Sequence, residues 1–239
     1  MTRSPFQDLA SVYAAARPTY PDGIYDALPL AGATVADVGA GTGISTRGML
    51  ARGARVVAFD LAPAMLARVG AHPALLLGTA VADAHALPLR DASLDLVTYA
   101  QAFHWTTPER AVAEARRVLR PGGALALWWN HTAARDETWW QVQQDALESL
   151  SDGYSRDYRE RDHTADLATA FEDVTTIEVP WVRELDVETY VVYLSSKSYV
   201  AALGERMPGF LDGQRELLAA TFADGVVREP FVTRLWLAR

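Results

Sequence analysis

Residues 34–43 read Thr-Val-Ala-Asp-Val-Gly-Ala-Gly-Thr-Gly, and this stretch decides the fold. Its first half is a short apolar run, which predicts a buried strand over 34–38. The glycines of 39–43 predict a sharp turn, because glycine reaches backbone conformations that other residues avoid. Residues 44–52 then predict a helix that Gly53 closes. The N–H groups at the start of such a helix are free to face a ligand.

The same alternation of apolar runs and helical segments continues along the chain. We expect strands over residues 55–59, 75–77, 95–100 and 124–129, and helices over 63–69 and 108–119. Two late strands are expected over 171–182 and 232–238, with helical material between them. Strands that alternate with helices predict an α/β fold with a doubly wound, mostly parallel sheet, here Rossmann-like and seven-stranded.

The regions on either side of this alternating core differ from it in predicted structure and in composition. Residues 6–16 and 21–28 predict two helices, which we interpret as an N-terminal lid. Residues 131–165 are polar, arginine-rich and aromatic, and they look like an inserted cap. We therefore expect one domain over 1–239, with a lid in 1–30, a cofactor-binding half in 31–130, and cap and substrate-side elements in 131–239.

Composition excludes several classes of function. The formal net charge of −8 argues against nucleic-acid partners and anionic membranes. The chain has no cysteine, so disulfides and thiolate metal sites are excluded. No signal peptide or apolar run of about 18 residues is present, and we expect a cytoplasmic protein. The 22 basic residues include a single lysine, Lys197, a bias typical of a GC-rich bacterial genome.

Two carboxylates follow the next two predicted strands. Asp60 ends one strand and can accept two hydrogen bonds from a ribose diol. Asp83 follows the next, where it can accept from an adenine amino group with the Ala84 N–H facing the ring. Taken singly, Asp60 is more often a helix N-cap and Asp83 more often a solvated loop residue. Together with the glycine turn, they predict a nucleotide ligand.

Several motifs resemble those of the class I S-adenosylmethionine (SAM)-dependent methyltransferases. The resembling segments are residues 37–43, Asp60, 83–88, 95–97 and 119–123. The resemblance covers roughly residues 30–130 well and the rest loosely. Tyr13, Arg17-Pro18, Tyr20-Pro21 and residues 101–105 are similar to a type 11-like, small-molecule subgroup that includes trans-aconitate and other carboxyl methyltransferases. Asp37 departs from the glutamate that is commoner at the start of the glycine motif.

The resemblance implies SAM as the cofactor and S-adenosylhomocysteine as the product. The glycine turn would follow the methionine part and ribose of SAM, Asp60 would bind the ribose, and Asp83 would bind the adenine. Gln101 would lie near the methionine backbone, and Arg17 near its carboxylate or an acidic substrate. The full implied cofactor set is Tyr13, Arg17, Asp37, Gly39, Ala40, Gly41, Thr42, Gly43, Asp60, Leu61, Met65, Asp83, Ala84 and Gln101.

His104 is the candidate catalytic base, because it follows the fourth strand on the expected ligand side of the sheet. The ordinary pKa of histidine, about 6.5, suits proton acceptance at neutral pH. Its alternative role is to orient Trp105 or to bond a backbone carbonyl. The histidines form no spaced cluster with carboxylates, so we expect no metal site.

Aromatic side chains with polar tips are the candidates for an acceptor pocket. The candidate substrate-binding residues are Tyr20, Phe103, Trp105, Trp139, Ser198 and Tyr199. Such aromatic side chains are more often part of a hydrophobic core, and that alternative stays open for each of them.

The leading hypothesis is methyl transfer to an oxygen or carbon of a small molecule, with secondary metabolism as the expected setting. A protein that binds SAM without transferring a methyl group is a second hypothesis, because a fold does not determine chemistry. A nicotinamide-dependent oxidoreductase is a third. Against it, Gly43 follows Gly41 by two positions, whereas dinucleotide binders usually have three. No pattern specifies the acceptor or the oligomeric state.

Overall fold

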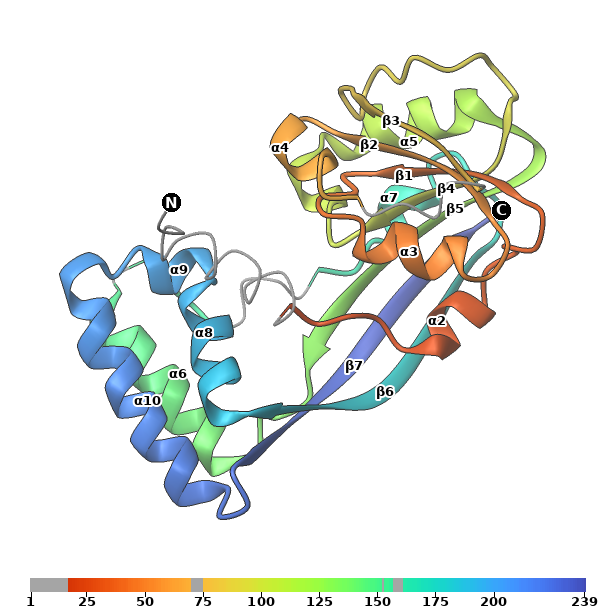
Figure 1. Ribbon diagram of the computed structural model, residues 1–239. Coiled ribbons are helices and arrows are strands. Elements are labelled where there is room, and N and C mark those ends of the chain that lie inside the picture. The colour runs from red at the N-terminus through yellow and green to blue at the C-terminus, as the bar shows by residue number, and fades with distance from the viewer. Residues whose placement is uncertain (1–16, 70–74, 152, 157–160) are drawn as a thin grey trace. The chain divides into compact units, whose positions relative to one another are not determined.

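The computed structural model describes residues 17–69, 75–151, 153–156 and 161–239 (Figure 1). These residues form two compact units, which we describe separately. The unit that we call the sheet unit comprises residues 19–131, 162–179 and 232–239. The unit that we call the helical unit comprises the described residues of 1–18, 132–161 and 180–231.

The sheet has seven strands in the order β3-β2-β1-β4-β5-β7-β6. Their bounds are β1 Thr34–Val38, β2 Arg55–Asp60, β3 Leu76–Val81, β4 Leu94–Ala100, β5 Leu119–Thr132, β6 Val174–Asp186 and β7 Val226–Ala238. Strand β1 pairs in parallel with both β2 and β4, β2 pairs in parallel with β3, and β4 pairs in parallel with β5. The predicted α/β class and the seven-stranded, mostly parallel sheet are confirmed.

Helices cover both faces of the central strands. In the sheet unit they are α2 Asp22–Asp26, α3 Ile44–Leu50, α4 Pro63–Leu66, the 3₁₀ helix η1 Phe103–Trp105, α5 Pro108–Val118 and α7 Thr164–Leu167. Successive residues of a strand point to opposite faces, so each central strand contributes to two cores. Val35 of β1 packs with Met49 of α3, whereas its neighbour Ala36 packs with Val112 of α5. This double coverage explains why the strands are apolar throughout and do not alternate.

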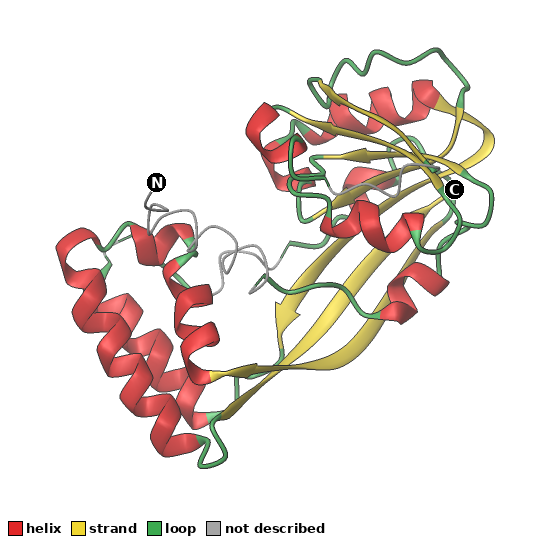
Figure 2. Ribbon diagram, in the orientation of Figure 1, coloured by secondary structure: helices red, strands yellow, loops and turns green. Residues whose placement is uncertain are grey.

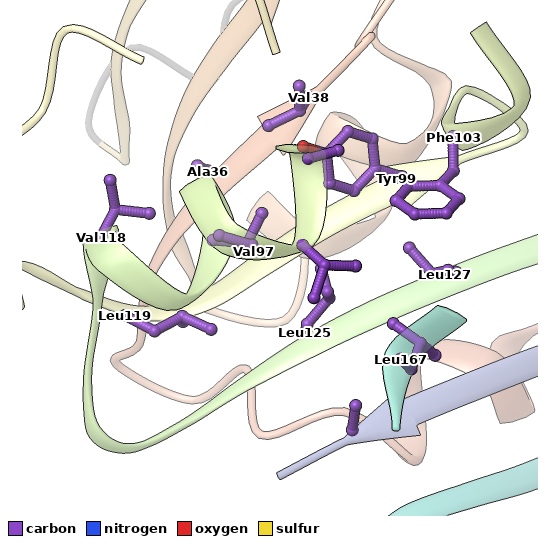
Figure 3. Packing of buried hydrophobic residues seen from close by; sticks show 14 of the residues in the cluster. Ala36, Val38, Val97, Tyr99, Phe103, Val118, Leu119, Leu125, Leu127 and Leu167 are labelled. Atoms are coloured by element: carbon purple, nitrogen blue, oxygen red, sulfur yellow. The ribbon is translucent and has the colours of Figure 1, made fainter. Parts of the chain in front are cut away.

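Figure 3 shows part of the core beneath α5. Val97 and Tyr99 of β4 lie beside Leu125 and Leu127 of β5, and Phe103 covers the end of this layer. All five side chains are fully buried. This packing holds the ends of the strands, and the loops that follow them, on a rigid base.

The helical unit contains α6 Thr138–Leu150, α8 Val187–Ser195, α9 Ser198–Ala201, the 3₁₀ helix η2 Gly204–Arg206 and α10 Met207–Thr221 (Figure 2). Helix α10 packs against both α6 and α8. Their shared core includes Trp139, Tyr190 and Leu218. The sequence predicts an aromatic cap over 131–165, but this compact unit also draws in residues 180–231.

Several element boundaries differ from the predictions. Strand β3 is longer than the expected 75–77, β6 begins after the expected residue 171, and β7 begins before residue 232. Helix α2 lies within the predicted 21–28, whereas the helix predicted over 6–16 lies outside the described residues. Among the described helices, none combines the length and the apolar character that crossing a bilayer requires.

Candidate functional site

Three chain segments meet at the carboxyl edge of the sheet. Val38, the last residue of β1, is in register with Phe59 of β2, and Asp60 of β2 is in register with Val81 of β3. The glycine turn after β1, Asp60 and the loop that carries Asp83 therefore occupy neighbouring positions. Ligands of open α/β sheets bind at this edge.

The glycine turn has the backbone that its sequence predicts. Gly39, Gly41 and Gly43 have φ of 70°, 56° and 79°, in the left-handed region that favours glycine. A Cβ built on Gly39 would lie 2.4 Å from the Cβ of Ala102, so the turn packs closely on the segment after β4. A Cβ built on Gly41 would meet nothing within 4 Å. The backbone at Gly41 therefore faces open space.

Asp37, the residue two positions before this turn, is hydrogen-bonded to the elements on either side of it. Its carboxylate is fully buried and accepts hydrogen bonds from Ser45 Oγ at 2.6 Å and Thr46 Oγ1 at 2.6 Å, both on α3. Thr98 Oγ1 of β4 donates a third at 3.1 Å. Burial raises the pKa of Asp37, while the three hydroxyl donors act in the opposite direction. In the structure, Asp37 thus ties β1 to the helix that follows the turn.

Asp60 connects two backbone segments through separate oxygens. Its Oδ2 accepts from the Gly41 N–H at 2.8 Å, and its Oδ1 accepts from the Ala62 N–H at 2.8 Å. A carboxylate has about four lone-pair sites, so each oxygen retains capacity for another donor. Asp60 is only partly buried, and that capacity is open to a ligand.

Asp83 is held by a histidine two residues along the chain. Its Oδ1 accepts from the backbone N–H of His85 at 2.9 Å and lies 2.6 Å from the ring nitrogen Nδ1 of the same residue. His85 Nε2 accepts from the Thr107 N–H at 2.9 Å, which requires the neutral ring with its proton on Nδ1. The His85 backbone N–H, and then its ring, lower the pKa of the Asp83 carboxyl. Only Oδ1 of Asp83 is engaged in these bonds, and the residue is exposed.

Sequence reasoning missed this role of His85. A histidine two positions after a candidate carboxylate is within reach of it through an Asx-type turn, and that spacing was the available signal. The contact with Thr107 could not be read from the sequence, because it joins loops separated by the whole of β4.

Two apolar side chains beside these carboxylates are exposed. Leu61 directly follows Asp60 and is 70% exposed, and Met65 of α4 is 41% exposed. Ala84 is half-buried. Apolar side chains next to two carboxylates form a surface on which a planar ring with polar edges can lie.

Gln101 has a strained backbone at the end of β4. Its φ is 53°, a left-handed value that costs a residue with a Cβ about 1–2 kcal/mol. The Gln101 N–H donates to Trp128 O at 2.9 Å, and its Nε2 donates to Tyr20 Oη at 3.5 Å. Such strain often occurs at functional sites, and a contact between Gln101 and the cofactor stays a prediction.

The segment after Gln101 forms η1. Phe103 is buried between Tyr99 and His163, with ring centroids 5.3 Å and 5.4 Å away. His104 is exposed, and its ring lies 4.7 Å from that of Trp105, which is 81% exposed. The structure therefore gives Phe103 a place in the core, and leaves the surfaces of His104 and Trp105 open to solvent.

The remaining predicted residues lie outside the described residues, at the first described position or in the helical unit. Tyr13 and the side chain of Ser198 lie outside the described residues. Arg17 is exposed next to the first described turn. Trp139 is 4% exposed and packs edge-on against Tyr190, and the Tyr199 ring is tilted against that of Tyr154 with ring centres 4.5 Å apart, all within the helical unit.

Comparisons with known proteins identify relatives of this chain. A family model described as a methyltransferase domain matches residues 36–127. A protein of Mycobacterium tuberculosis named as an uncharacterized methyltransferase is 38% identical over 222 residues, which are 90% of this chain and 85% of that protein. A malonyl-[acyl-carrier protein] O-methyltransferase of Methylococcus capsulatus is 44% identical over 100 residues, 39% of this chain and 36% of the relative.

Solved structures show the same fold. A type II methyltransferase structure from Anaeromyxobacter dehalogenans has a TM-score of 0.73 at 24% sequence identity, with 93% of this chain and 97% of that chain covered. A methyltransferase from an antibiotic biosynthesis pathway of Anabaena variabilis has a TM-score of 0.64 at 18% identity, with 88% and 96% covered. The similarity in fold thus extends over most of the chain, beyond the residues that the family model matches.

Proposed function

This chain belongs to the class I SAM-dependent methyltransferases, and from that premise we propose that it methylates an oxygen or carbon atom of a small-molecule acceptor. SAM is its cofactor, and S-adenosylhomocysteine its product. The observation that carries the proposed cofactor site is the hydrogen bond between Asp60 and the Gly41 N–H, which joins the carboxylate after β2 to the glycine turn after β1.

The residues at this edge fit SAM in shape and polarity. The space over Gly41 admits a ligand against bare backbone. Asp60 offers acceptor capacity for the ribose hydroxyls, and the free oxygen of Asp83 suits an adenine amino donor. The exposed side chains of Leu61 and Met65 supply apolar faces for the adenine ring. Gln101 would contact the methionine part from the end of β4.

SAM, when bound, supplies an electrophilic methyl group on a positively charged sulfur. The protein then has to place the acceptor atom in line with that group and exclude water. We assign His104 as the group that accepts the acceptor's proton, because it lies in η1, three residues after Gln101, and is exposed. Trp105, which is exposed beside His104, would line the acceptor's path.

Calorimetry and methyl transfer test this function directly. Titration of the protein with SAM and with S-adenosylhomocysteine should give saturable binding, whereas titration with NAD should give none. Methyl-labelled SAM should then pass its label to a member of a panel of small phenols, hydroxy acids and carbon acids. Label found only in protein or nucleic-acid substrates, or NAD binding in place of SAM, would contradict the proposal.

His104→Gln tests the base. Glutamine keeps hydrogen-bonding capacity but cannot take up a proton at neutral pH, so kcat should fall about a hundredfold while SAM affinity stays within about twofold. The measurement is single-turnover methyl transfer together with calorimetry of SAM. Full activity in this variant would show that His104 is structural, or that the acceptor atom needs no deprotonation.

His85→Ala tests the support of Asp83. Without the ring, Asp83 keeps only the backbone N–H of residue 85 as a partner, so its carboxylate is held less firmly and SAM affinity should fall about tenfold. If His85 only stabilised the fold, its loss would not change the preference for adenine over hypoxanthine. Binding of adenosine is therefore compared with binding of inosine. The wild-type protein should prefer adenosine, whose amino group donates to Asp83, and the variant should lose most of this preference. An unchanged preference would remove Asp83 from the adenine site.

A further inference from the structure

The helical unit contains a recess between α6 and α10, two helices that lie side by side (Figure 1). The recess has a volume of about 420 Å³. Small-molecule sites usually have volumes of about 300–1,000 Å³, so this one is large enough for a ligand. All of its lining residues belong to the helical unit. They are Ala146 and Leu150 of α6, Arg206 of η2, and Gly209, Phe210, Gly213 and Gln214 of α10.

Two glycines leave the α10 side of this recess open. Gly209 and Gly213 are about one helical turn apart, and a Cβ built on either would meet nothing within 4 Å. Glycine within a helix is less stable than alanine, because it has more conformational freedom to lose. Packing does not require glycine at either position, since a larger residue would fit. Together with the apolar side chains of Leu150 and Phe210, the bare backbone forms a surface against which an apolar chain can lie.

Gln214 brings an unsatisfied amide to the same recess. The residue is 4% exposed, and its Oε1 has no hydrogen-bond partner among the described residues. A buried amide oxygen without a donor destabilises the folded protein, whereas a leucine of similar size would not carry this cost. A ligand hydroxyl would satisfy the amide in either of its two orientations, because a hydroxyl both donates and accepts.

Arg206 supplies a positive charge at the amino end of α10. It is exposed, and within the part of the chain that the structure describes it forms no ion pair, not even with its neighbour Glu205. The first turn of α10 has no acidic residue, and no side chain caps the helix. The helix dipole disfavours a cation at this end and favours an anion. The acidic residues of α6 beside the recess, Asp145 and Glu148, are paired with Arg156, so Arg206 is available to a ligand anion.

We propose that this recess binds a free, elongated organic acid that has a hydroxyl group at its far end. The carboxylate pairs with Arg206, the apolar chain lies over Gly209 and Gly213, and the hydroxyl bonds to the amide of Gln214. Arg206 and Gln214 are eight residues apart, which corresponds to about 12 Å along a helix. An extended chain gains about 1.2 Å per bond, so a chain of about ten carbons spans this distance. The inference does not depend on the proposed methyl transfer, because the recess is built from the helical unit alone.

The probe is ω-hydroxydecanoate, and calorimetry compares it with two ligands of the same chain length. Decanoate lacks the hydroxyl, and the α,ω-diol lacks the charge. The wild-type protein should bind the hydroxy acid about tenfold more tightly than either of them. Arg206→Met should remove the preference for the hydroxy acid over the diol. Gln214→Leu should remove the preference for the hydroxy acid over decanoate, and it should not lower the unfolding temperature, because it eliminates an unsatisfied buried amide.

Gly213→Leu fills the recess without disturbing the fold. Leucine favours the helix more than glycine does, and its Cβ has room, so the unfolding temperature should equal or exceed that of the wild type while binding of the hydroxy acid is lost. Ala219→Leu is the matched control. Ala219 is exposed on α10 and does not line the recess, so the same added side chain should leave binding unchanged there.

Three results of calorimetry would each overturn the proposal. They are no binding of the hydroxy acid to the wild type, equal affinity in wild type and Gly213→Leu, and equal affinity of the wild type for the hydroxy acid and the diol. Vesicles of phosphatidylglycerol distinguish a free acid from the acyl chain of a membrane lipid. Co-sedimentation with these vesicles that Gly213→Leu abolishes would identify a membrane ligand and overturn the free acid, whereas its absence supports the proposal.

Discussion

Replacing Gly39 by alanine is expected to lower the free energy of unfolding by about 3 kcal/mol, because two penalties add at this position. The backbone has φ of 70°, where a Cβ crowds the following carbonyl. The new methyl group would also lie 2.4 Å from the Cβ of Ala102, a distance that forces the turn or the segment after β4 to move. Thermal unfolding should show a midpoint lowered by roughly 6–12 °C.

Gly41→Ala is the matched control for this prediction. Gly41 has φ of 56°, but a Cβ there meets nothing within 4 Å, so only the conformational penalty of about 1–2 kcal/mol remains. The same methyl group would project into the proposed SAM space, so SAM affinity should fall in this variant despite its milder loss of stability. If the two substitutions lowered the free energy of unfolding equally, the close approach of Gly39 to Ala102 would contribute little to the loss of stability.

The second large effect is expected at Asp60. Asp60→Ala should weaken SAM binding by about two orders of magnitude, because it removes the proposed acceptor of the ribose hydroxyls and the charge that assists those bonds. It also frees the Gly41 N–H and the Ala62 N–H, which Asp60 now connects at 2.8 Å each. Calorimetry of SAM and of S-adenosylhomocysteine should show the same loss, since both carry the ribose.

Asp95→Ala controls for the loss of a carboxylate from the sheet. Asp95 lies near the amino end of β4, accepts from the Thr34 N–H at 2.7 Å and pairs with Arg120 at 2.9 Å. Its replacement should reduce stability but leave SAM affinity within about twofold, because it belongs to the other end of the strands. Unchanged SAM affinity in a folded Asp60→Ala protein would remove the ribose assignment.

The central strands were predictable because their signal is local. Strands β1, β2 and β4 are short apolar runs bounded by glycine or aspartate, and each was predicted to within one residue at either end. Strand β3 was underestimated. It pairs with β2 alone at the edge of the sheet, and Leu77 and Val81 on its outer side are exposed. Hydrogen bonding to β2 extends it past Gly78, which interrupts the apolar pattern.

The bounds of the two last strands, β6 and β7, also depend on pairing that the local sequence does not reveal. Strand β6 continues through Pro180, and an edge strand tolerates proline because its outward N–H needs no partner. Strand β7 begins at Val226, six residues before the expected start at 232, in a stretch interrupted by Arg228, Glu229 and Pro230 whose extended form depends on its neighbours in the sheet. Patterns of single segments carry no information about such pairing.

In the candidate site, too, the local features were predictable from the sequence and the long-range contacts were not. The glycine turn, Asp60 and Asp83 were found from the sequence, because each directly follows a strand and the parallel topology brings strand ends together. The bonds that organise them were not found. His85 supports Asp83 through Thr107, and Asp37 bonds α3 and β4 from a fully buried position. The sequence alone suggested that Asp37 touches the cofactor, a role that stays a prediction.

The amino-acid order of this chain by itself determined the alternation of strands and helices, the left-handed glycine turn and the acidic residues at strand ends. Each of these depends on neighbours within a few positions, where local sterics and hydrophobic periodicity act. Only the tertiary structure decided that Phe103 and Trp139 are core residues and that the Lys197 ammonium lies beside two tyrosine rings. Burial and charge balance arise from residues far apart in the chain, so they are settled only when packing brings those residues together.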